Sequence, residues 1–243
     1  MLSPLVKVPL LPSNAGFLSS AFKLKPPRPP PPPTELKRFD QPDLMSATAS
    51  TQMTLAAIVR TALCGVALAE AAVIVAQQYP SELSRTVFSI LPGAYRVRTA
   101  LHITPVFLVG SALTAAGSII RIFCYHALGK FFTWQVSVQD DHKLITAGPY
   151  AVVRHPSYTG WTLLAVGKAM AVLSRGSYFV ESGMWATWQG KAAAGTVVGY
   201  LAFVTYALLS RVEKEDAVLS RQFGEEWGAW AQRTPYRLIP FVY

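Results

Sequence analysis

The feature that most constrains this chain is a series of four apolar runs, each close to the length of a bilayer-spanning helix. The runs cover residues 61–79, 101–125, 158–173 and 192–209. A helix needs about 20 mainly apolar residues to cross the hydrocarbon core of a bilayer. Because 51% of the residues are hydrophobic and only 14% are charged, the composition is typical of a polytopic membrane protein. We therefore expect an all-α integral membrane protein with about four to five transmembrane helices.

Lysine and arginine are distributed unevenly among the segments between these runs. Residues 1–52, 121–154 and 211–243 together hold 15 of them, whereas residues 80–100 and 175–191 hold 5. Cytoplasmic loops of membrane proteins carry the excess of positive charge, so we expect both termini to be cytosolic. The charges flank the apolar runs and form no stripe on a soluble domain. The net charge of +9 therefore indicates anionic lipid headgroups as partners and no nucleic acid.

The N-terminal region differs in composition from the rest of the chain. The stretch PPRPPPPP at residues 26–33 is polyproline II or disordered. No acidic residue precedes Glu35, a bias that loosely resembles an organellar transit peptide. The alternatives are a disordered cytosolic tail or an overextended sequence that begins before Met45 or Met53. We expect residues 1–52 to be a disordered, proline-rich, basic tail.

A cationic segment leads directly into the third apolar run, in the sequence GPYAVVRHPSYTGW at residues 148–161. Pro156 keeps His155 out of the helical region, and proline is well placed at the first position of a helix. We expect the third helix to begin near Pro156, with Ser157 and Tyr158 in its first turn. The unpaired N–H groups of that turn suit acceptor atoms of a ligand. The alternative is a plain interfacial anchor at the membrane surface.

A second charged segment follows the fourth run. Arg211 and Glu215 are four residues apart and share one face of a helix. Either they form an exposed salt bridge worth a few tenths of a kcal/mol, or Arg211 binds an anion while Glu215 receives hydroxyls or a cation. The apolar side of the same helix is expected at Leu208, Val212, Leu219 and Phe223.

Two blocks of residues surround the helical hairpin between these segments. The first block is Gln135, His142-Lys143-Leu144-Ile145, Gly148-Pro149-Tyr150 and Arg154-His155-Pro156-Ser157-Tyr158-x-Gly160-Trp161. The second is Arg211-x3-Glu215-Asp216-x2-Leu219-x3-Phe223-Gly224-Glu225-Glu226-Trp227. In this order, over residues 125–243, the blocks resemble the isoprenylcysteine carboxyl methyltransferase family. The Arg-His-Pro-x-Tyr element alone is shared with phospholipid methyltransferases and some membrane sterol reductases, whereas the pair of blocks is more specific.

The resemblance implies a membrane enzyme whose active site lies at the cytosolic face and is roofed by the C-terminal helical tail. It implies methylation of the C-terminal α-carboxylate of a prenylated cysteine after CaaX processing, with S-adenosyl-L-methionine as cofactor, in the endoplasmic reticulum. The implied catalytic residues are Arg211, which also binds the substrate, and Glu215. The implied cofactor-binding residues are Gln135, His142, Lys143, Leu144, Ile145, Tyr150, His155, Pro156, Ser157, Tyr158 and Glu215. No metal and no stable protein partner are expected.

The family pattern is not followed at every position. Trp227 stands where the family more often has Tyr, Asp216 where Glu is usual, and Lys168 is an unusual charge within the third run. Lys168 and Glu70 both fall within expected spans, where a charged residue by default indicates function. The alternatives are that Lys168 snorkels and that Glu70 faces a neighbouring helix. We expect the chain to divide into N-terminal transmembrane helices over residues 53–125 and a catalytic part over residues 126–243.

The proposed chemistry is consistent with the residues at hand. The chain has no Gly-x-Gly-x-Gly after a strand, so the sequence does not favour a soluble Rossmann-type methyltransferase. An α-carboxylate, with a pKa of roughly 3.3–3.7, is ionised at neutral pH and attacks without a general base. The alternatives are methylation of a phospholipid or another lipid-borne acceptor, a membrane sterol or quinone reductase, and a non-catalytic paralogue. An amine acceptor would lose a proton and would need a base near the site.

Overall fold

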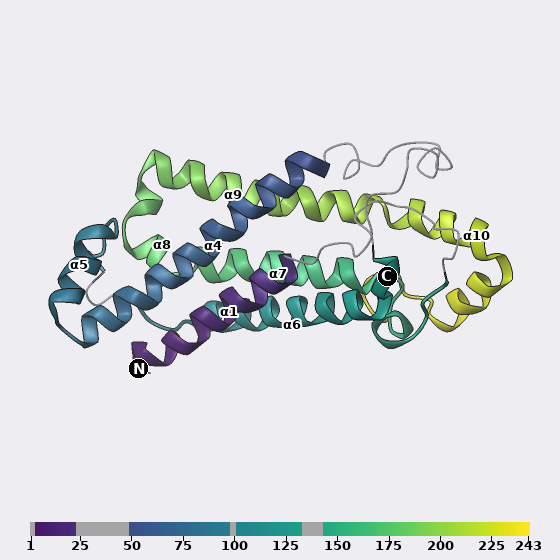
Figure 1. The fold of residues 1–243 in the computed structure, drawn as a ribbon, viewed down its shortest axis with the longest axis horizontal. Helices are drawn as coiled ribbons and strands as arrows, with labels where there is room; N and C mark the ends of the chain where they lie inside the picture. Colours follow the sequence, from purple (N-terminus) through teal and green to yellow (C-terminus); the bar gives the residue numbers. More distant parts are fainter. Residues whose placement is uncertain (1–2, 23–48, 98–100, 133–142) are drawn as a thin grey trace.

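The computed structural model describes residues 3–22, 49–97, 101–132 and 143–243. These residues form an elongated bundle of helices, with no strand among them (Figure 1). Four helical segments are long and apolar enough to cross a membrane: Thr51–Gln78, Pro105–Phe131, Pro156–Glu181 and Trp188–Arg233. The prediction of an all-helical chain with four membrane spans is therefore confirmed.

The spanning helices are α4 (Ala49–Gln78), α6 (Pro105–Leu128), α7 (Pro156–Leu173) and α9 (Trp188–Ser210). Thr104 caps α6 by accepting a hydrogen bond from the backbone of the third helical residue, and Pro105 occupies the first position. Pro156 likewise occupies the first position of α7, where His155 lies outside the helical region and makes no side-chain cap. The prediction that the third span begins at Pro156 is therefore confirmed. The helix of the first span, α4, begins earlier than predicted, at Ala49.

The helices α6 and α7 form a closely packed pair. At two levels, Gly110 faces Gly167 and Gly117 faces Gly160, and a methyl group added at any of these glycines would meet the backbone of the opposite helix. Because glycine has no side chain, the two backbones can approach closely, as they do where small residues line membrane helix interfaces. The pair therefore forms a tight support for the beginning of α7, where the cationic segment lies.

The structure corrects the prediction that the N-terminal region is a disordered tail. Residues 4–6 form a short 3-10 helix, η1 (Pro4–Val6), and α1 (Lys7–Phe22) follows it. One face of α1 is buried in the bundle, through Leu11, Ala15, Leu18 and Ala21. That burial removes apolar surface from solvent and outweighs the cost of Pro12 inside the helix. The proline run at residues 26–33 lies outside the described residues.

The helix α1 runs alongside α4 (Figure 1). Its first residue, Lys7, lies beside His102 and Gly176, and α1 begins toward the end of the bundle opposite α10 (Figure 1). Its last residue, Phe22, lies against Trp161, near the beginning of α7. The beginning of α1 and the end of α10 (Val212–Arg233) thus lie toward opposite ends of the molecule. The expectation that both termini are cytosolic stays a prediction.

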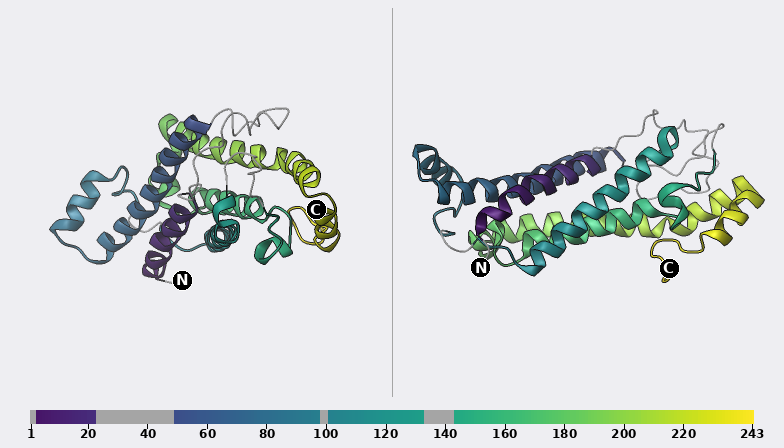
Figure 2. Two further views of the ribbon diagram at one scale, coloured as in Figure 1. Left: turned by 45° about the vertical axis from the view of Figure 1, so that its right-hand side comes forward. Right: turned by 90° about the horizontal axis from the view of Figure 1, so that it is seen from below.

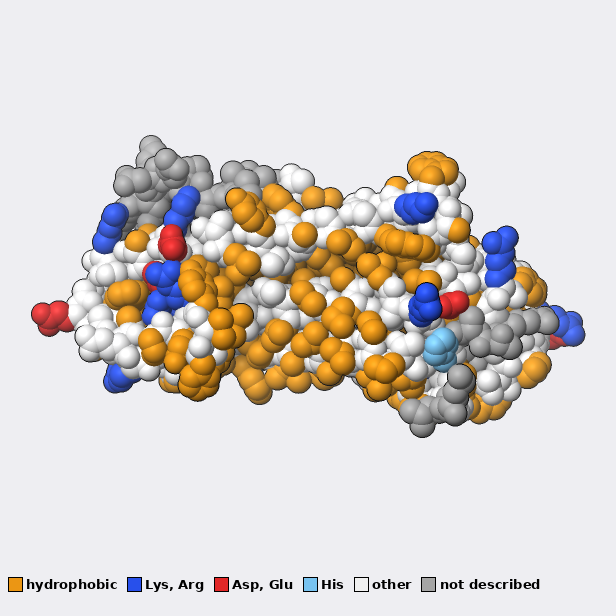
Figure 3. Space-filling model, turned by 180° about the vertical axis from the view of Figure 1, so that it is seen from behind, with side chains coloured by type: hydrophobic (Ala, Val, Ile, Leu, Met, Phe, Trp, Pro, Cys, Tyr) orange, Lys and Arg blue, Asp and Glu red, His pale blue; other side chains and the backbone are white. Residues whose placement is uncertain are grey.

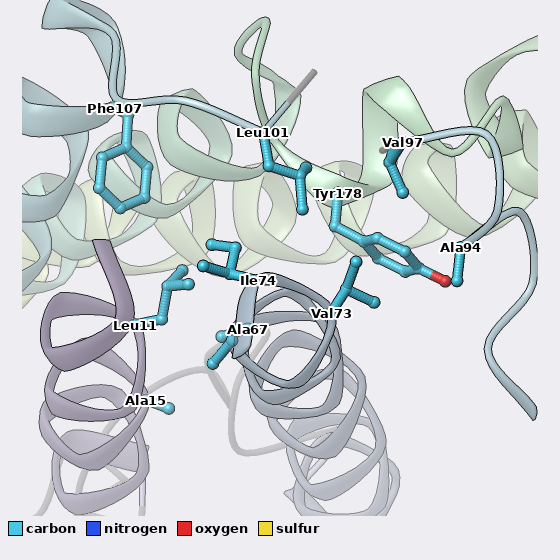
Figure 4. Packing of buried hydrophobic residues seen from close by; sticks show 11 residues of the cluster. Leu11, Ala15, Ala67, Val73, Ile74, Ala94, Val97, Leu101, Phe107 and Tyr178 are labelled. Atoms are coloured by element: carbon cyan, nitrogen blue, oxygen red, sulfur yellow. The ribbon is translucent and has the colours of Figure 1, made fainter. Parts of the chain in front are cut away.

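A hydrophobic core joins the N-terminal helices to the end of the bundle opposite α10. Leu11 and Ala15 of α1 meet Ala67 and Ile74 of α4, and the ring of Tyr178 approaches from the short helix α8 (Tyr178–Glu181) (Figure 4). Phe107 at the beginning of α6 completes this contact. The core thereby fixes α1 against α4 and α6, which is why residues of the expected tail are ordered.

Buried charged side chains lie in the same region. Lys7 and Glu70 form an ion pair, and their side chains are 0% and 4% exposed. Glu70 also accepts a hydrogen bond from the Tyr178 backbone N–H at 3.1 Å. Glu70 therefore faces a neighbouring helix, one of the two alternatives considered for it. Lys168 is buried in α7, and together with Glu70 and Ser111 it lines a small cavity between α1, α4, α6 and α7.

The remaining elements cover the two ends of the bundle. The amphipathic helix α5 (Glu82–Ile90) and the turn η4 (Met184–Ala186) lie at one end, and α10 extends from the other (Figure 2). Viewed from behind, apolar side chains cover the middle of the molecule, while charged side chains gather toward its ends (Figure 3). This distribution fits a bundle whose middle lies in hydrocarbon.

Candidate functional site

The candidate site lies where α10 begins beside the N-terminus of α7. Glu215 accepts a hydrogen bond from the Tyr158 hydroxyl at 2.5 Å, and its carboxylate is 3.6 Å from Nδ1 of His155. The rings of His155 and Tyr158 are stacked, with centroids 5.5 Å apart. The Arg211 guanidinium lies 5.9 Å from the centroid of the Tyr158 ring. Arg211 and Glu215, predicted to share a helix face, therefore converge on the same tyrosine.

Asp216 is the centre of a second set of contacts at this junction. Its carboxylate accepts from Arg154 at 3.1 Å and is 3.1 Å from Nε2 of His155. Nε of Arg237 is 3.4 Å from the same carboxylate. A buried carboxylate is tolerated when cations and hydrogen bonds compensate for lost hydration. Asp216 therefore ties together the cationic segment before α7, the start of α10 and the C-terminal tail.

The C-terminal tail is held against the same segment by hydrogen bonds to its main chain. The backbone N–H groups of Arg154 and His155 donate to the carbonyl oxygens of Tyr236 and Arg237 at 2.9 and 2.8 Å. The Arg154 guanidinium donates to the carbonyl oxygens of residues 234 and 235. Thr159 donates to the carbonyl oxygen of Leu238 at 2.6 Å. These bonds fix the tail over the start of α7.

His155 is held as a cation by its surroundings. Burial disfavours the imidazolium, but the hydrogen bonds to Asp216 and Glu215 outweigh it and raise the pKa of His155 to about 9. At neutral pH the ring therefore carries a positive charge between two carboxylates. A protonated imidazole is a donor from both nitrogens, so at this pH it orients Glu215 and Asp216 and is not a general base.

An aromatic and apolar cluster adjoins the charged residues. Tyr150, in the 3-10 turn η3 (Gly148–Ala151), packs with Trp230 of α10, and Leu144 and Ile145 pack against them. The Trp230 indole N–H donates to the carbonyl oxygen of Tyr150 at 3.1 Å. Trp227 joins the cluster, and Arg154 lies 5.8 Å from its ring centroid. The cluster is thus continuous with the charged residues around Asp216.

Arg121 brings a further cation to the beginning of α7 from α6. Its guanidinium lies 3.4 Å from the carbonyl and hydroxyl oxygens of Ser157 and 5.3 Å from the ring centroid of Trp161. Its Nε is buried and makes no hydrogen bond within the part of the chain that the structure describes. A buried guanidinium with spare donor capacity is suited to an anionic ligand.

The structure brings most of the predicted site residues together. The residues that meet at this junction are Leu144, Ile145, Tyr150, His155, Pro156, Ser157, Tyr158, Arg211 and Glu215. Lys143 is exposed, and Gln135 and His142 lie outside the described residues. The roles assigned to all of these residues stay predictions.

Sequence reasoning did not include Asp216, Arg154 and Arg121 among the site residues. A signal for Asp216 was present: it lies four residues after Val212 and three before Leu219, on the predicted apolar side of α10. Asp216 is indeed buried with Val212. A carboxylate on the core side of a helix requires a cationic partner, and Arg154 is that partner.

Comparisons with known proteins agree with the motifs. Residues 109–188 match the family model described as isoprenylcysteine carboxyl methyltransferase. The chain is 29% identical over 135 residues to protein-S-isoprenylcysteine O-methyltransferase B of Arabidopsis thaliana, covering 55% of this chain and 58% of the relative. It is 28% identical over 143 residues to the human protein-S-isoprenylcysteine O-methyltransferase, covering 58% and 43%. A Delta(14)-sterol reductase of Methylotuvimicrobium alcaliphilum is 26% identical over 110 residues, covering 44% and 21%.

The matched part of the chain contains much of the candidate site. The family match begins within α6 and includes the η3 turn and all of α7, whereas the block at residues 211–227 lies beyond it. The chain spans between about two fifths and three fifths of the methyltransferases reported above. The predicted resemblance to the isoprenylcysteine carboxyl methyltransferase family is therefore confirmed, and residues 109–188 carry it.

Proposed function

We propose that this protein methylates the C-terminal α-carboxylate of a prenylated cysteine, as left by CaaX processing, with S-adenosylmethionine as methyl donor. The observation that carries the proposal is the convergence of Arg211 and Glu215 on Tyr158, where a membrane helix begins. A cation for an acceptor carboxylate and a carboxylate for a cationic donor thus contact one tyrosine. Relatives named protein-S-isoprenylcysteine O-methyltransferase support the acceptor class.

The residues present fit S-adenosylmethionine. Glu215 is about a quarter exposed at its side chain and suits the positive groups of the cofactor. The apolar and aromatic side chains of Leu144, Ile145 and Tyr150 suit a planar base. The Trp227 indole nitrogen is buried without a hydrogen-bond partner among the described residues, so a donor there is available to a ligand. When bound, the cofactor supplies an electrophilic methyl group on a positively charged sulfur.

The chain's own contribution is orientation and exclusion of water. The acceptor carboxylate is ionised at neutral pH and needs no general base, which agrees with a His155 that is already protonated. Arg211 is buried and would hold the carboxylate in a fixed direction through its planar fork. Charge cancels between carboxylate and sulfonium as the methyl group moves, so a site with few water molecules lowers the barrier.

The position of the site at the end of the bundle suits two very different reactants. A prenyl chain partitions into the bilayer, with about 0.8 kcal/mol for each buried CH₂ group. The acceptor would arrive from the hydrocarbon side along α7 and α9, and the cofactor from water on the side of α10. We propose that this end faces the cytosol and that the protein resides in the endoplasmic reticulum membrane.

The test is a methyl-transfer assay with purified protein, labelled S-adenosylmethionine and a farnesylated cysteine analogue. We expect a base-labile methyl ester, lost in R211A while cofactor binding persists. R221A on the exposed side of α10 is the matched control and should retain turnover. If R211A lost cofactor binding and still handled the acceptor, the role given to Arg211 would be wrong.

The same assay decides between this function and its alternatives. Label in the lipid extract without a methyl ester would favour a phospholipid or other lipid-borne acceptor. Consumption of NADPH without transfer of label would favour a sterol or quinone reductase; the Methylotuvimicrobium alcaliphilum relative is named as a sterol reductase. Binding of neither cofactor would favour a non-catalytic membrane adaptor.

A further inference from the structure

The small cavity between α1, α4, α6 and α7 has a wall that is partly polar, although three of these helices are membrane spans. Its volume is about 20 Å³. Its apolar lining includes Leu11, Ala67 and Phe107, which belong to the core shown in Figure 4. Polar groups within a membrane span are costly and require compensation. Here they come from all four helices: Asn14, Glu70, Ser111, Thr114 and Lys168.

Three of the polar side chains have hydrogen-bonding capacity that no other described residue uses. Lys168 is 4% exposed and makes no hydrogen bond or ion pair with another described residue. The Ser111 hydroxyl and Oδ1 of Asn14 are buried and have no hydrogen-bond partner among the described residues. The amide nitrogen of Asn14 donates to the carbonyl oxygen of Leu10 at 2.9 Å, which identifies Oδ1 as the spare acceptor. Because buried polar groups are nearly always satisfied, three such groups around one cavity indicate a ligand.

We propose that the cavity is a binding site for one water molecule, which joins Lys168, Ser111 and Asn14. A cavity holds a water molecule once its volume exceeds roughly 10–15 Å³, and this cavity has about 20 Å³. A buried water typically makes about three hydrogen bonds to groups that lack other partners. The three residues offer that number, since Lys168 donates, Asn14 accepts and the Ser111 hydroxyl can do either.

The charges around the cavity favour a neutral ligand over an ion. An anion would meet the carboxylate of Glu70 and the bare Oδ1 of Asn14, whereas a cation would meet the ammonium group of Lys168. An apolar ligand would leave all three spare groups unsatisfied, at the full cost of their burial. Water both donates and accepts, so it satisfies all three groups without adding charge.

This site gives Lys168 a role that is separate from methyl transfer and independent of the proposed function. Lys168 belongs to α7, Ser111 to α6 and Asn14 to α1, so the water connects the N-terminal helix to the α6–α7 pair. Residues 109–188, which match the family model, contain Ser111 and Lys168, whereas Asn14 lies well before them. Lys168 is therefore hydrated inside the bundle and does not snorkel to the membrane surface.

The experiment is radiolytic footprinting of the purified protein, in which X-rays generate hydroxyl radicals from bound water as well as from bulk water. A side chain beside a bound water is oxidised even when it is buried. We expect oxidation of Phe107, which lines the cavity although it is only 3% exposed. Phe179 is the matched control, because it is 4% exposed and does not line the cavity, and it should stay unlabelled.

Two variants at one position separate the loss of the water from the loss of a hydroxyl. In S111V the added methyl groups occupy the cavity, so the label on Phe107 should fall to the level of Phe179. In S111A the space remains and the water keeps Lys168 and Asn14 as partners, so the label should persist. Should S111V not fold, A171V fills the same cavity from α7 and should also abolish the label.

The remaining outcomes overturn the proposal. A wild-type protein in which Phe107 is labelled no more than Phe179 has a dry cavity. A label that persists in folded S111V or A171V does not come from water in this cavity. If replacing gluconate by chloride in the buffer removes the label from the wild type, the site takes an anion instead of water. None of these measurements depends on methyl transfer, so their failure leaves the proposed function untouched.

Discussion

Breaking the ion pair between α1 and α4 should be the most damaging single change in the N-terminal half. Lys7 is fully buried and donates to the carbonyl oxygen of Gly176 at 2.9 Å and to that of His102 at 3.3 Å, besides pairing with Glu70. In K7M, Glu70 would keep one hydrogen bond, from the Tyr178 backbone N–H, and would be a buried carboxylate without its cation.

The size of the effect follows from burial. Removing one partner of a buried ion pair typically costs about 3–5 kcal/mol, because the other charge is left uncompensated. A change of 1 kcal/mol shifts Tm by roughly 2–4 °C in a chain of this size. We therefore expect Tm of K7M to fall by roughly 10 °C. The double variant K7M/E70L places apolar groups at both positions and should recover most of the loss, since such replacements are often neutral.

The assay is thermal unfolding of purified protein in detergent, followed by loss of helical signal. The Glu82–Arg85 pair is the matched control, because its side chains are 85% and 77% exposed and exposed pairs contribute little. R85A should leave Tm unchanged. The reasoning is refuted if K7M unfolds at the same temperature as R85A, or if K7M/E70L is at least as unstable as K7M.

Three further predictions concern the site and the α6–α7 pair. The pKa of His155 is about 9 in the folded protein against a reference of 6.5. The stability that protonated His155 contributes is therefore full below about pH 6.5 and is lost as the pH rises through about 9. The difference in Tm between wild type and H155Q should shrink between pH 6.5 and 9.5, and a constant difference contradicts this prediction. G117A places a methyl group against the backbone of α7 and should reduce stability by about 1–3 kcal/mol, whereas G65A, where α4 offers open space, should not. D216N removes the counter-charge of a buried cation and should lower both Tm and turnover, while E213Q, whose side chain is 78% exposed, should lower neither.

Much of the fold could be predicted because membrane burial leaves a strong sequence signal. The four spans follow from apolar runs long enough to cross a bilayer, and the start of α7 follows from proline chemistry at Pro156. The helix α1 was not predicted, because it is only 16 residues long, contains Pro12 and adjoins a proline run. Its spacing of Leu11, Ala15, Leu18 and Phe22 is nevertheless that of one helix face.

The site was only partly predictable, because its contacts join distant segments. The spacing of Arg211 and Glu215 indicated a shared helix face, but nothing local to either residue indicated that both would meet Tyr158. The salt bridge from Arg154 to Asp216 joins residues 62 positions apart. Such pairings are set by the way α9 and α10 return over α7, which is a property of packing rather than of local sequence.

The bonds that hold the C-terminal tail have a consequence for how this region tolerates change. Arg154, His155 and Thr159 all bind carbonyl oxygens of residues 234–238, and a carbonyl oxygen is the same group whichever side chain the residue carries. The anchoring therefore depends on the number of residues between the end of α10 and the tail more than on their identity. Substitutions that spare the buried side chains of Thr234 and Leu238 and the contact of Arg237 with Asp216 should be tolerated. A deletion or insertion of a single residue would instead shift every acceptor past its donor.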